Sequence, residues 1–201
     1  KKLREETQFE LVKIQESLGV TFIVVTHDQE EAMSLATRIG VMNYGEIVMV
    51  GEPTDIYEFP NSRFVAGFIG SVNMVEGVVT EDEDDHVRIR SAELGCDIHV
   101  GHGVDCAPDQ KLWWAIRPEK IRLTRDPPPA DLAPDGANRV HGMVEDIAYL
   151  GDMTVYQVRL DGGKYLRVTK SNESRGDPEA ITWDEAVWAS WNASAGSVLV
   201  S

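Results

Sequence analysis

The most constraining feature of the sequence is a β-branched apolar run that ends in a histidine and leads directly into a helix. Residues 23–32 are IVVTHDQEEA, and His27 separates the apolar run from a typical helix-capping pattern. We therefore expect a buried strand over residues 20–26 and a helix over residues 28–36. This arrangement places the imidazole of His27 at the carboxyl end of a strand, the edge at which open α/β sheets bind ligands.

The rest of the amino-terminal third is predicted to alternate between helices and one hairpin. Apolar spacing and a following glycine predict a helix over residues 2–18, and the turn at Asn43-Tyr44-Gly45 predicts a hairpin. The expected elements are the helix 2–18, the hairpin strands 38–43 and 46–50, a short helix from Pro53 to about Phe59, and a second short helix over residues 62–68.

The pattern changes after Gly70, where short alternating segments follow one another with turns between them. Such regular short strands are typical of a small antiparallel barrel or of two such barrels. A proline-rich break at residues 126–129 interrupts the series. The expected strands are 74–79, 86–90, 97–100, 111–116, 120–124, 139–148, 154–160, 165–170, 186–189 and 197–200.

Two sets of motifs resemble known families. The string at 23–32, together with RIGVMNYGEI at 38–47 and GEPTDIY at 51–57, resembles the switch-histidine region of ABC-transporter ATPases, and residues 2–6 look like the segment after the D-loop of that family. The resemblance implies that residues 1–70 are the C-terminal remnant of an ABC nucleotide-binding domain, the end of the P-loop NTPase fold.

The second resemblance covers the remainder of the chain. WAIRPEKI at 114–121, IAYLGD at 147–152 and VYQV at 155–158 resemble the TOBE region, an OB-like barrel appended to importer ATPases. The predicted fold class is thus α+β, with an ATPase remnant over residues 1–70 and an all-β, OB-like regulatory barrel region over residues 71–201.

Within this superfamily the sequence looks most like the ATP-binding subunits of polyamine importers, and most closely like the putrescine branch. The segments that carry this likeness are FIGSVNMVEG at 68–77, IAYLGD at 147–152 and Thr182-Trp183. Importers of sugars, sulfate or iron share the architecture and remain alternatives.

The motifs that such an ATPase uses to bind phosphate do not occur in these 201 residues. A phosphate loop requires Gly-x4-Gly-Lys-Ser/Thr, but Gly163-Lys164 is followed by Tyr165 and is preceded by Val158 at the position of the first glycine. Asp184-Glu185 follows too short an apolar segment to be the magnesium-binding strand end, and no Ser-Gly-Gly signature is present. We expect the 201-residue chain alone to be inactive as an ATPase, and a dimerising regulatory or small-ligand-binding module is an alternative function.

His27 is the candidate catalytic residue, and the resemblance gives it the role of the switch histidine. In the intact parent it would contact the γ-phosphate of ATP and help to position the attacking water, with Mg²⁺ as the second cofactor. No cofactor is expected on this chain alone. We assign Asp28 to the helix N-cap because Asp28 and Glu31 have capping-box spacing, and Gln29 and Glu30 to an exposed first turn.

The charge argues against nucleic-acid binding. With 19 Lys and Arg against 34 Asp and Glu, the formal net charge is −15, whereas nucleic-acid-binding modules carry a basic face. The run of five carboxylates at residues 81–85 is interpreted as a solvated hairpin tip. No apolar stretch reaches the length of a membrane span, and no secretory signal opens the sequence. Two cysteines make no disulfide framework and suit a reducing cytoplasm.

Two groups of residues are candidates for ligand sites, but another interpretation is preferred for each. The first contains metal-binding residue types, but their spacing fits no zinc pattern, so no metal site is predicted. The second contains aromatic residues suited to a cation–π pocket, for which packing is the preferred interpretation, with the last three tryptophans at one barrel end. The groups are Cys96, His99, His102 and Cys106, and Trp113, Trp114, Trp183, Trp188 and Trp191.

The predicted partners are a second copy of the chain and, in the intact transporter, integral membrane permease subunits. Because a strand at residues 20–26 would lack the neighbours of a central sheet, exposed edges and apolar residues favour a homodimer. Direct insertion into the membrane is not expected. The resemblance implies a peripheral location on the cytoplasmic face of the bacterial plasma membrane.

Overall fold

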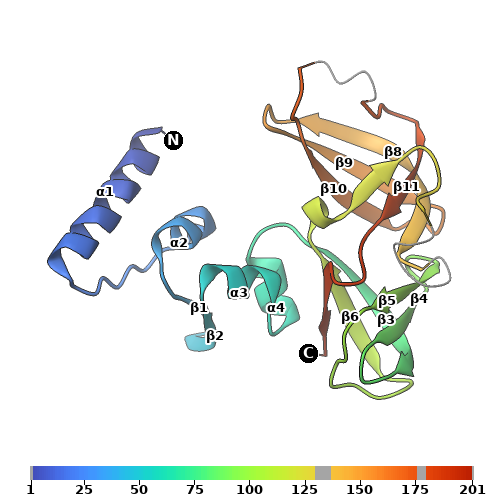
Figure 1. The fold of residues 1–201 in the computed structure, drawn as a ribbon, viewed down its shortest axis with the longest axis horizontal. Helices are drawn as coiled ribbons and strands as arrows, with labels where there is room; N and C mark the ends of the chain where they lie inside the picture. Colours follow the sequence, from blue (N-terminus) through green and yellow to red (C-terminus); the bar gives the residue numbers. More distant parts are fainter. Residues whose placement is uncertain (1, 130–136, 176–179, 201) are drawn as a thin grey trace. The chain divides into compact units, whose positions relative to one another are not determined.

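The computed structural model describes residues 2–129, 137–175 and 180–200 (Figure 1). The chain forms two compact units, Lys1–Gly70 and Ser71–Ser201. The first unit contains helices and one hairpin, and the second is built from strands.

The first unit follows most of the predicted element order. Its small core is formed by the buried side chains of Ile39, Val41, Ile56, Val65 and Ile69. The β1–β2 pair is antiparallel and forms a two-stranded sheet. The elements are α1 (Lys2–Leu18), α2 (Gln29–Leu35), β1 (Ile39–Asn43), β2 (Glu46–Gly51), α3 (Pro53–Glu58) and α4 (Arg63–Phe68).

The predicted strand over residues 20–26 is wrong. These residues form neither helix nor strand, and the side chains of Ile23 and Val25 are 88% and 95% exposed. A buried parallel strand depends on hydrogen-bonding neighbours and on cover for both faces. The only sheet among the described residues of this unit is the β1–β2 hairpin. The β-branched run therefore has the composition of a strand without the partners that would make it one.

Helix α1 is present as predicted, but most of its apolar side chains that the structure describes are exposed. Phe9 is 69% exposed and Leu18 is 64% exposed. The spacing of apolar residues thus predicted the helix correctly, although it did not predict burial.

The second unit contains two five-stranded antiparallel sheets. Their orders are β12-β6-β3-β4-β5 and β10-β9-β8-β11-β7. The prediction of one strand over residues 120–124 is corrected, because Pro118 starts a 3-10 turn, η1 (Pro118–Lys120), before the strand. The strands are β3 (Asn73–Asp82), β4 (Val87–Ser91), β5 (Cys96–Val100), β6 (Lys111–Ile116), β7 (Arg122–Thr124), β8 (Arg139–Tyr149), β9 (Met153–Leu160), β10 (Tyr165–Ser171), β11 (Ala186–Ser190) and β12 (Gly196–Leu199).

The two sheets repeat one topology and exchange their last strands. Strand β3 lies between β4 and β6, and β8 lies between β9 and β11 in the same way. However, β7 follows β6 in the chain and pairs with β11, whereas β12 follows β11 and pairs with β6. Each sheet therefore holds four strands of one half and the last strand of the other. The halves cannot separate without breaking these pairings.

A local sequence repeat underlies the repeated topology. Residues 73–79 are NMVEGVV and residues 138–144 are NRVHGMV, with Asn, Val, Gly and Val at matching positions. A Cβ on Gly77 would lie 2.3 Å from Cγ2 of Ile89, and one on Gly142 would lie 2.6 Å from the carbonyl oxygen of Arg159. Both glycines thus permit a close approach of the neighbouring strand.

One hydrophobic core joins the inner faces of both sheets. Its buried residues come from both halves, and they include Trp114 and Trp191, whose ring centroids lie 5.0 Å apart. The run of short strands predicted after Gly70 is confirmed, and the chain as a whole is mostly β.

Candidate functional site

His27 is exposed and lies between the irregular segment 20–26 and helix α2. The residue after it caps the helix, since Oδ1 of Asp28 accepts a hydrogen bond from the N–H of Glu31 at 3.1 Å. The predicted N-cap is confirmed. The N–H of Asp28 also donates to Oγ1 of Thr26 at 3.0 Å, so the backbone is fixed on both sides of His27.

Gln29 has a role that the sequence interpretation missed. Its Nε2 donates to the carbonyl oxygen of Phe68, and its Oε1 accepts from the N–H of Gly70 at 2.8 Å. One side chain thus ties the start of α2 to the end of α4. No local pattern indicates this contact, because the partners lie 39 and 41 residues further along the chain.

The candidate zinc residues do not form a metal-binding group. Among the described residues, no three His, Cys, Asp or Glu side chains are placed to hold a metal ion. Sγ of Cys106 lies 3.6 Å from Oδ1 of Asp82, whereas burial raises the pKa of the Cys96 thiol to about 12. A thiol with so high a pKa is a poor metal ligand and a poor nucleophile at neutral pH.

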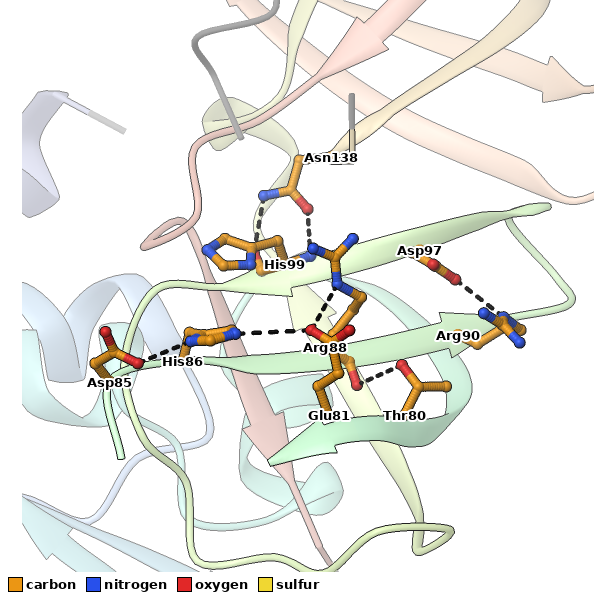
Figure 2. Close-up of polar contacts among 9 residues, drawn as sticks. All are labelled: Thr80, Glu81, Asp85, His86, Arg88, Arg90, Asp97, His99 and Asn138. Atoms are coloured by element: carbon orange, nitrogen blue, oxygen red, sulfur yellow. Dashed lines mark hydrogen bonds and ion pairs between the residues drawn. The ribbon is translucent and has the colours of Figure 1, made fainter. Parts of the chain in front are cut away.

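Two histidines of the second unit lie close together: His86 directly precedes β4, and His99 lies on β5 (Figure 2). The ring centroids of His86 and His99 are 5.2 Å apart. Nδ1 of His86 lies 2.8 Å from Oδ1 of Asp85, and Nε2 lies 3.7 Å from Oε2 of Glu81. Nε of Arg88 donates to the same Glu81 oxygen at 3.1 Å. The predicted hairpin tip at residues 81–85 is corrected in its bounds, because Glu81 and Asp82 belong to β3 and only the following residues connect it to β4. Two carboxylates of this run have partners, Glu81 in Arg88 and Asp85 in His86.

The two histidines have different electrostatic surroundings. The hydrogen bond to Asp85 raises the pKa of His86, and the hydrogen bond to His86 lowers the pKa of Asp85. Burial, followed by the charges of His86 and Arg88, lowers the pKa of His99. Neither His86 nor Asn138, which contacts the backbone of His99, was a candidate from the sequence.

The tryptophans divide into core and surface residues. Trp114 and Trp191 are buried, which confirms packing for these two. The ring of Trp188 lies 5.3 Å from His141 and 5.8 Å from the guanidinium carbon of Arg139. Trp183 is 58% exposed, so its predicted packing at a barrel end is wrong. The next residue, Asp184, has a φ of 60°, and its N–H donates a hydrogen bond to the backbone carbonyl oxygen of Val144.

The Arg-Pro-Glu motif is structural in this unit. Arg117 is buried, and its Nη1 donates to the carbonyl oxygen of Ser71 at 3.3 Å. Pro118 then occupies the first position of η1. The motif therefore ties the end of β6 to the segment that enters β3.

Residues 114–199 match the TOBE domain family. The chain contains a TOBE domain. The match spans β6 to β12 and includes the Arg-Pro-Glu motif and both exchanged strands.

Sequence relatives extend the similarity over the rest of the chain. The chain is 42% identical over 199 residues to the putrescine transport ATP-binding protein PotG of Escherichia coli K12, covering 99% of this chain and 52% of that protein. It is 41% identical to the spermidine/putrescine import ATP-binding protein PotA of Thermobifida fusca, covering 98% of this chain and 50% of that protein. The chain thus spans about half the length of these relatives. The resemblance to the ATP-binding subunits of polyamine importers is confirmed.

A solved structure supports the architecture around the TOBE domain. The molybdate-bound structure of the cytoplasmic molybdate-binding protein ModG aligns with a TM-score of 0.53 at 16% identity, covering 64% of this chain and 96% of that chain. At this identity the likeness concerns the fold alone. Together with the TOBE match it supports the predicted OB-like region, built here from two curled sheets. In the described part of the chain, no helix has the length and apolar character of a membrane span.

Proposed function

We propose that the chain belongs to the ATP-hydrolysing subunit that energises a bacterial polyamine importer, with putrescine or spermidine as the transported substrate. The observation that carries the proposal is the 42% identity to a putrescine transport ATP-binding protein over 99% of the chain. Residues 1–70 would then be the C-terminal part of an ABC nucleotide-binding domain, and residues 71–201 its appended regulatory domain.

Within this proposal His27 is the switch histidine. In the complete subunit its imidazole would contact the γ-phosphate of ATP, with Mg²⁺ bound by residues that these 201 positions do not contain. The geometry that supports this role is an exposed ring whose backbone is fixed by the Asp28 cap. Gln29 adds to it by holding α2 against the end of α4. A fixed backbone at this position limits the directions in which the imidazole can extend, which favours a reproducible contact with a phosphate.

The proposal also names partners and a location. A second copy of the subunit would supply the other half of an ATP-bound dimer, and integral membrane permease subunits would receive the movement. The subunit would be peripheral on the cytoplasmic face of the plasma membrane. The exposed apolar residues Phe22, Ile23 and Val25 support an interface, because covering each would contribute about 1.5–3 kcal/mol.

The test begins with the coding sequence on the amino-terminal side of Lys1. A phosphate loop and a signature motif in the same reading frame would define the complete subunit. Its ATPase activity and the uptake of radiolabelled putrescine are then measured in membranes that contain its permeases. His27→Ala should leave nucleotide binding in place and reduce hydrolysis by about 10²-fold. His102→Ala, which changes an exposed histidine of the second unit, is the matched control. Normal hydrolysis in the His27→Ala subunit would contradict the assigned role.

A second candidate is a dimerising regulatory module that binds a small molecule or a regulator. The observation in its favour is that the second unit has a continuous core and pairs its own exchanged strands. A start codon immediately before the codon for Lys1, in place of those upstream motifs, would favour this module. Uptake of a sugar, sulfate or iron in place of putrescine would instead support the importer function and assign a different transported substrate. Light scattering on the whole chain and on residues 71–201 would show whether either is a dimer, and which unit contains the contact.

A further inference from the structure

Two buried asparagines connect the sheets of the second unit in equivalent ways. The side-chain amide of Asn138 accepts from the N–H of His99 and donates to its carbonyl oxygen, both at 2.8 Å. The side-chain amide of Asn73 makes the same two bonds with Arg167, again at 2.8 Å. We call these pairs the Asn138 clasp and the Asn73 clasp. Each joins the segment entering one sheet to the edge strand of the other.

The two clasps differ in what surrounds them. The residue held by the Asn138 clasp is a histidine whose ring contacts a second histidine (Figure 2). The residue held by the Asn73 clasp is Arg167, which keeps its charge at all physiological pH values. Only the Asn138 clasp therefore holds a residue that can change its charge near neutral pH.

The surroundings of His99 oppose its protonation. Nδ1 of His99 is buried and has no hydrogen-bond partner in the described part of the chain, so a proton placed there would have no acceptor. The charged groups that face His99 are His86 and Arg88, which repel a proton, and Glu81 and Asp85, which attract it. Both carboxylates are already engaged, Glu81 by Arg88 and Asp85 by His86. The element on the other side contributes the uncharged amide of Asn138.

We propose that the His86–His99 pair makes the Asn138 clasp an acid-sensitive joint, which opens more readily as the pH falls below neutrality, whereas the opening of the Asn73 clasp does not change. Acid first charges His86, because Asp85 stabilises its proton. A second charge on His99 then lies 5.2 Å from the His86 ring with no acceptor of its own. Opening the β5 edge exposes the His99 ring to water, which supplies an acceptor for its proton and weakens the repulsion from the charged His86 ring.

The direction of the pH effect follows from linkage. The pKa of His99 is lowered in the closed state, so the open state binds the proton more readily. The closed state is therefore fully favoured above the unperturbed histidine pKa of about 6.5 and loses stability as the pH falls through that value. His86 acts in the opposite sense, because its raised pKa favours the folded state in acid and this contribution disappears as the pH rises through the folded-state pKa.

Hydrogen exchange on the whole chain provides the test, since each clasp contains one backbone N–H that reports on it. Protection factors of the His99 and Arg167 amides are compared at pH 7.5 and pH 5.5. The expected result is a fall in His99 protection relative to Arg167 of up to about tenfold, the limit set when His99 stays neutral in the closed state. An unchanged ratio between the two amides would overturn the proposal.

Two variants and one direct measurement complete the design. His99→Gln should abolish the fall, because glutamine does not titrate, whereas His102→Gln, at an exposed histidine three positions away, should retain it. A fall that persists in His99→Gln would refute the mechanism. Should His99→Gln fail to fold, NMR titration of the wild-type rings decides: His99 is expected to titrate below His86 and below pH 6.5. A His99 midpoint at or above that of His86 would contradict the proposal.

Discussion

The amide group of Asn138 hydrogen-bonds with both backbone groups of His99, a residue 39 positions earlier. A side-chain amide has the same donor and acceptor as a peptide group, so Asn138 takes the place of a neighbouring strand at the edge of β5. The backbone carbonyl oxygen of Asn138 also accepts a hydrogen bond from the N–H of Trp191 at 3.1 Å. One fully buried residue, directly before β8, thereby links β5 of one sheet to the residue that follows β11 of the other.

The clasps should contribute measurably to stability. Asn73→Ala is expected to lower the free energy of unfolding by about 2–4 kcal/mol, because two backbone groups of Arg167 lose their partners. Asn138→Ala should cost about 1 kcal/mol more, since Asn138 has a φ of 58°, which alanine adopts poorly. Urea unfolding measures both values.

Asn138→Gly separates the two contributions. Glycine tolerates the positive φ but removes the side-chain amide. We expect Asn138→Gly to resemble Asn73→Ala in stability. If Asn138→Gly were as stable as the wild type, the clasp would contribute nothing.

The close strand approach at Gly142 should not tolerate a methyl group. In Gly142→Ala the new Cβ would lie 2.6 Å from the carbonyl oxygen of Arg159 and 2.8 Å from Cγ1 of Val158, so we expect a loss of about 1–3 kcal/mol. Gly162→Ala is the matched control, because its Cβ would make only an ordinary contact of 3.5 Å with Glu93. Thermal unfolding of both variants should separate them, and equal midpoints would contradict the packing argument.

Cys96 should resist alkylation in the folded protein. With a pKa of about 12, only about 10⁻⁴ of the thiol is ionised at pH 8. Iodoacetamide labelling followed by mass spectrometry should modify Cys106 first, although burial also raises the pKa of that thiol. Cys106→Ser should remove the fast reaction, and rapid labelling of the remaining cysteine would contradict the raised pKa of Cys96.

Fluorescence quenching should distinguish the surface tryptophan from the core pair. Trp183 is 58% exposed, whereas Trp114 and Trp191 are each 2% exposed. Acrylamide should therefore quench an accessible component that Trp183→Phe largely removes. Trp188→Phe, a change at a half-buried ring, should leave most of that component in place. No difference between the two variants would show that Trp183 is covered in solution.

Local features were predictable because their causes lie within a few residues. The Asp28 cap follows from a carboxylate placed three positions before the N–H that it accepts from. The β1–β2 hairpin follows from turn residues between two apolar segments, and Gly45 indeed has a φ of 86°. The short strands after Gly70 follow from alternation and turns in the same way.

Features that depend on residues far apart in the sequence were not predictable from local sequence patterns. The sequence gives no indication of which sheet β7 and β12 join, because their pairing depends on edges that other strands leave free. The contacts of Gln29 with Phe68 and Gly70, and of His86 with His99, are likewise made across the fold.

The segment at residues 20–26 shows the same division most directly. Its β-branched residues and the histidine that follows are part of the string that resembles ABC-transporter ATPases, and together with the motifs further along the chain they allowed the sequence alone to determine the relationship to polyamine-importer ATP-binding proteins. Whether those residues form a strand was decided by tertiary structure, since a strand exists only where neighbouring backbone groups satisfy its hydrogen bonds. Here Ile23 and Val25 have no such neighbours among the described residues and remain exposed.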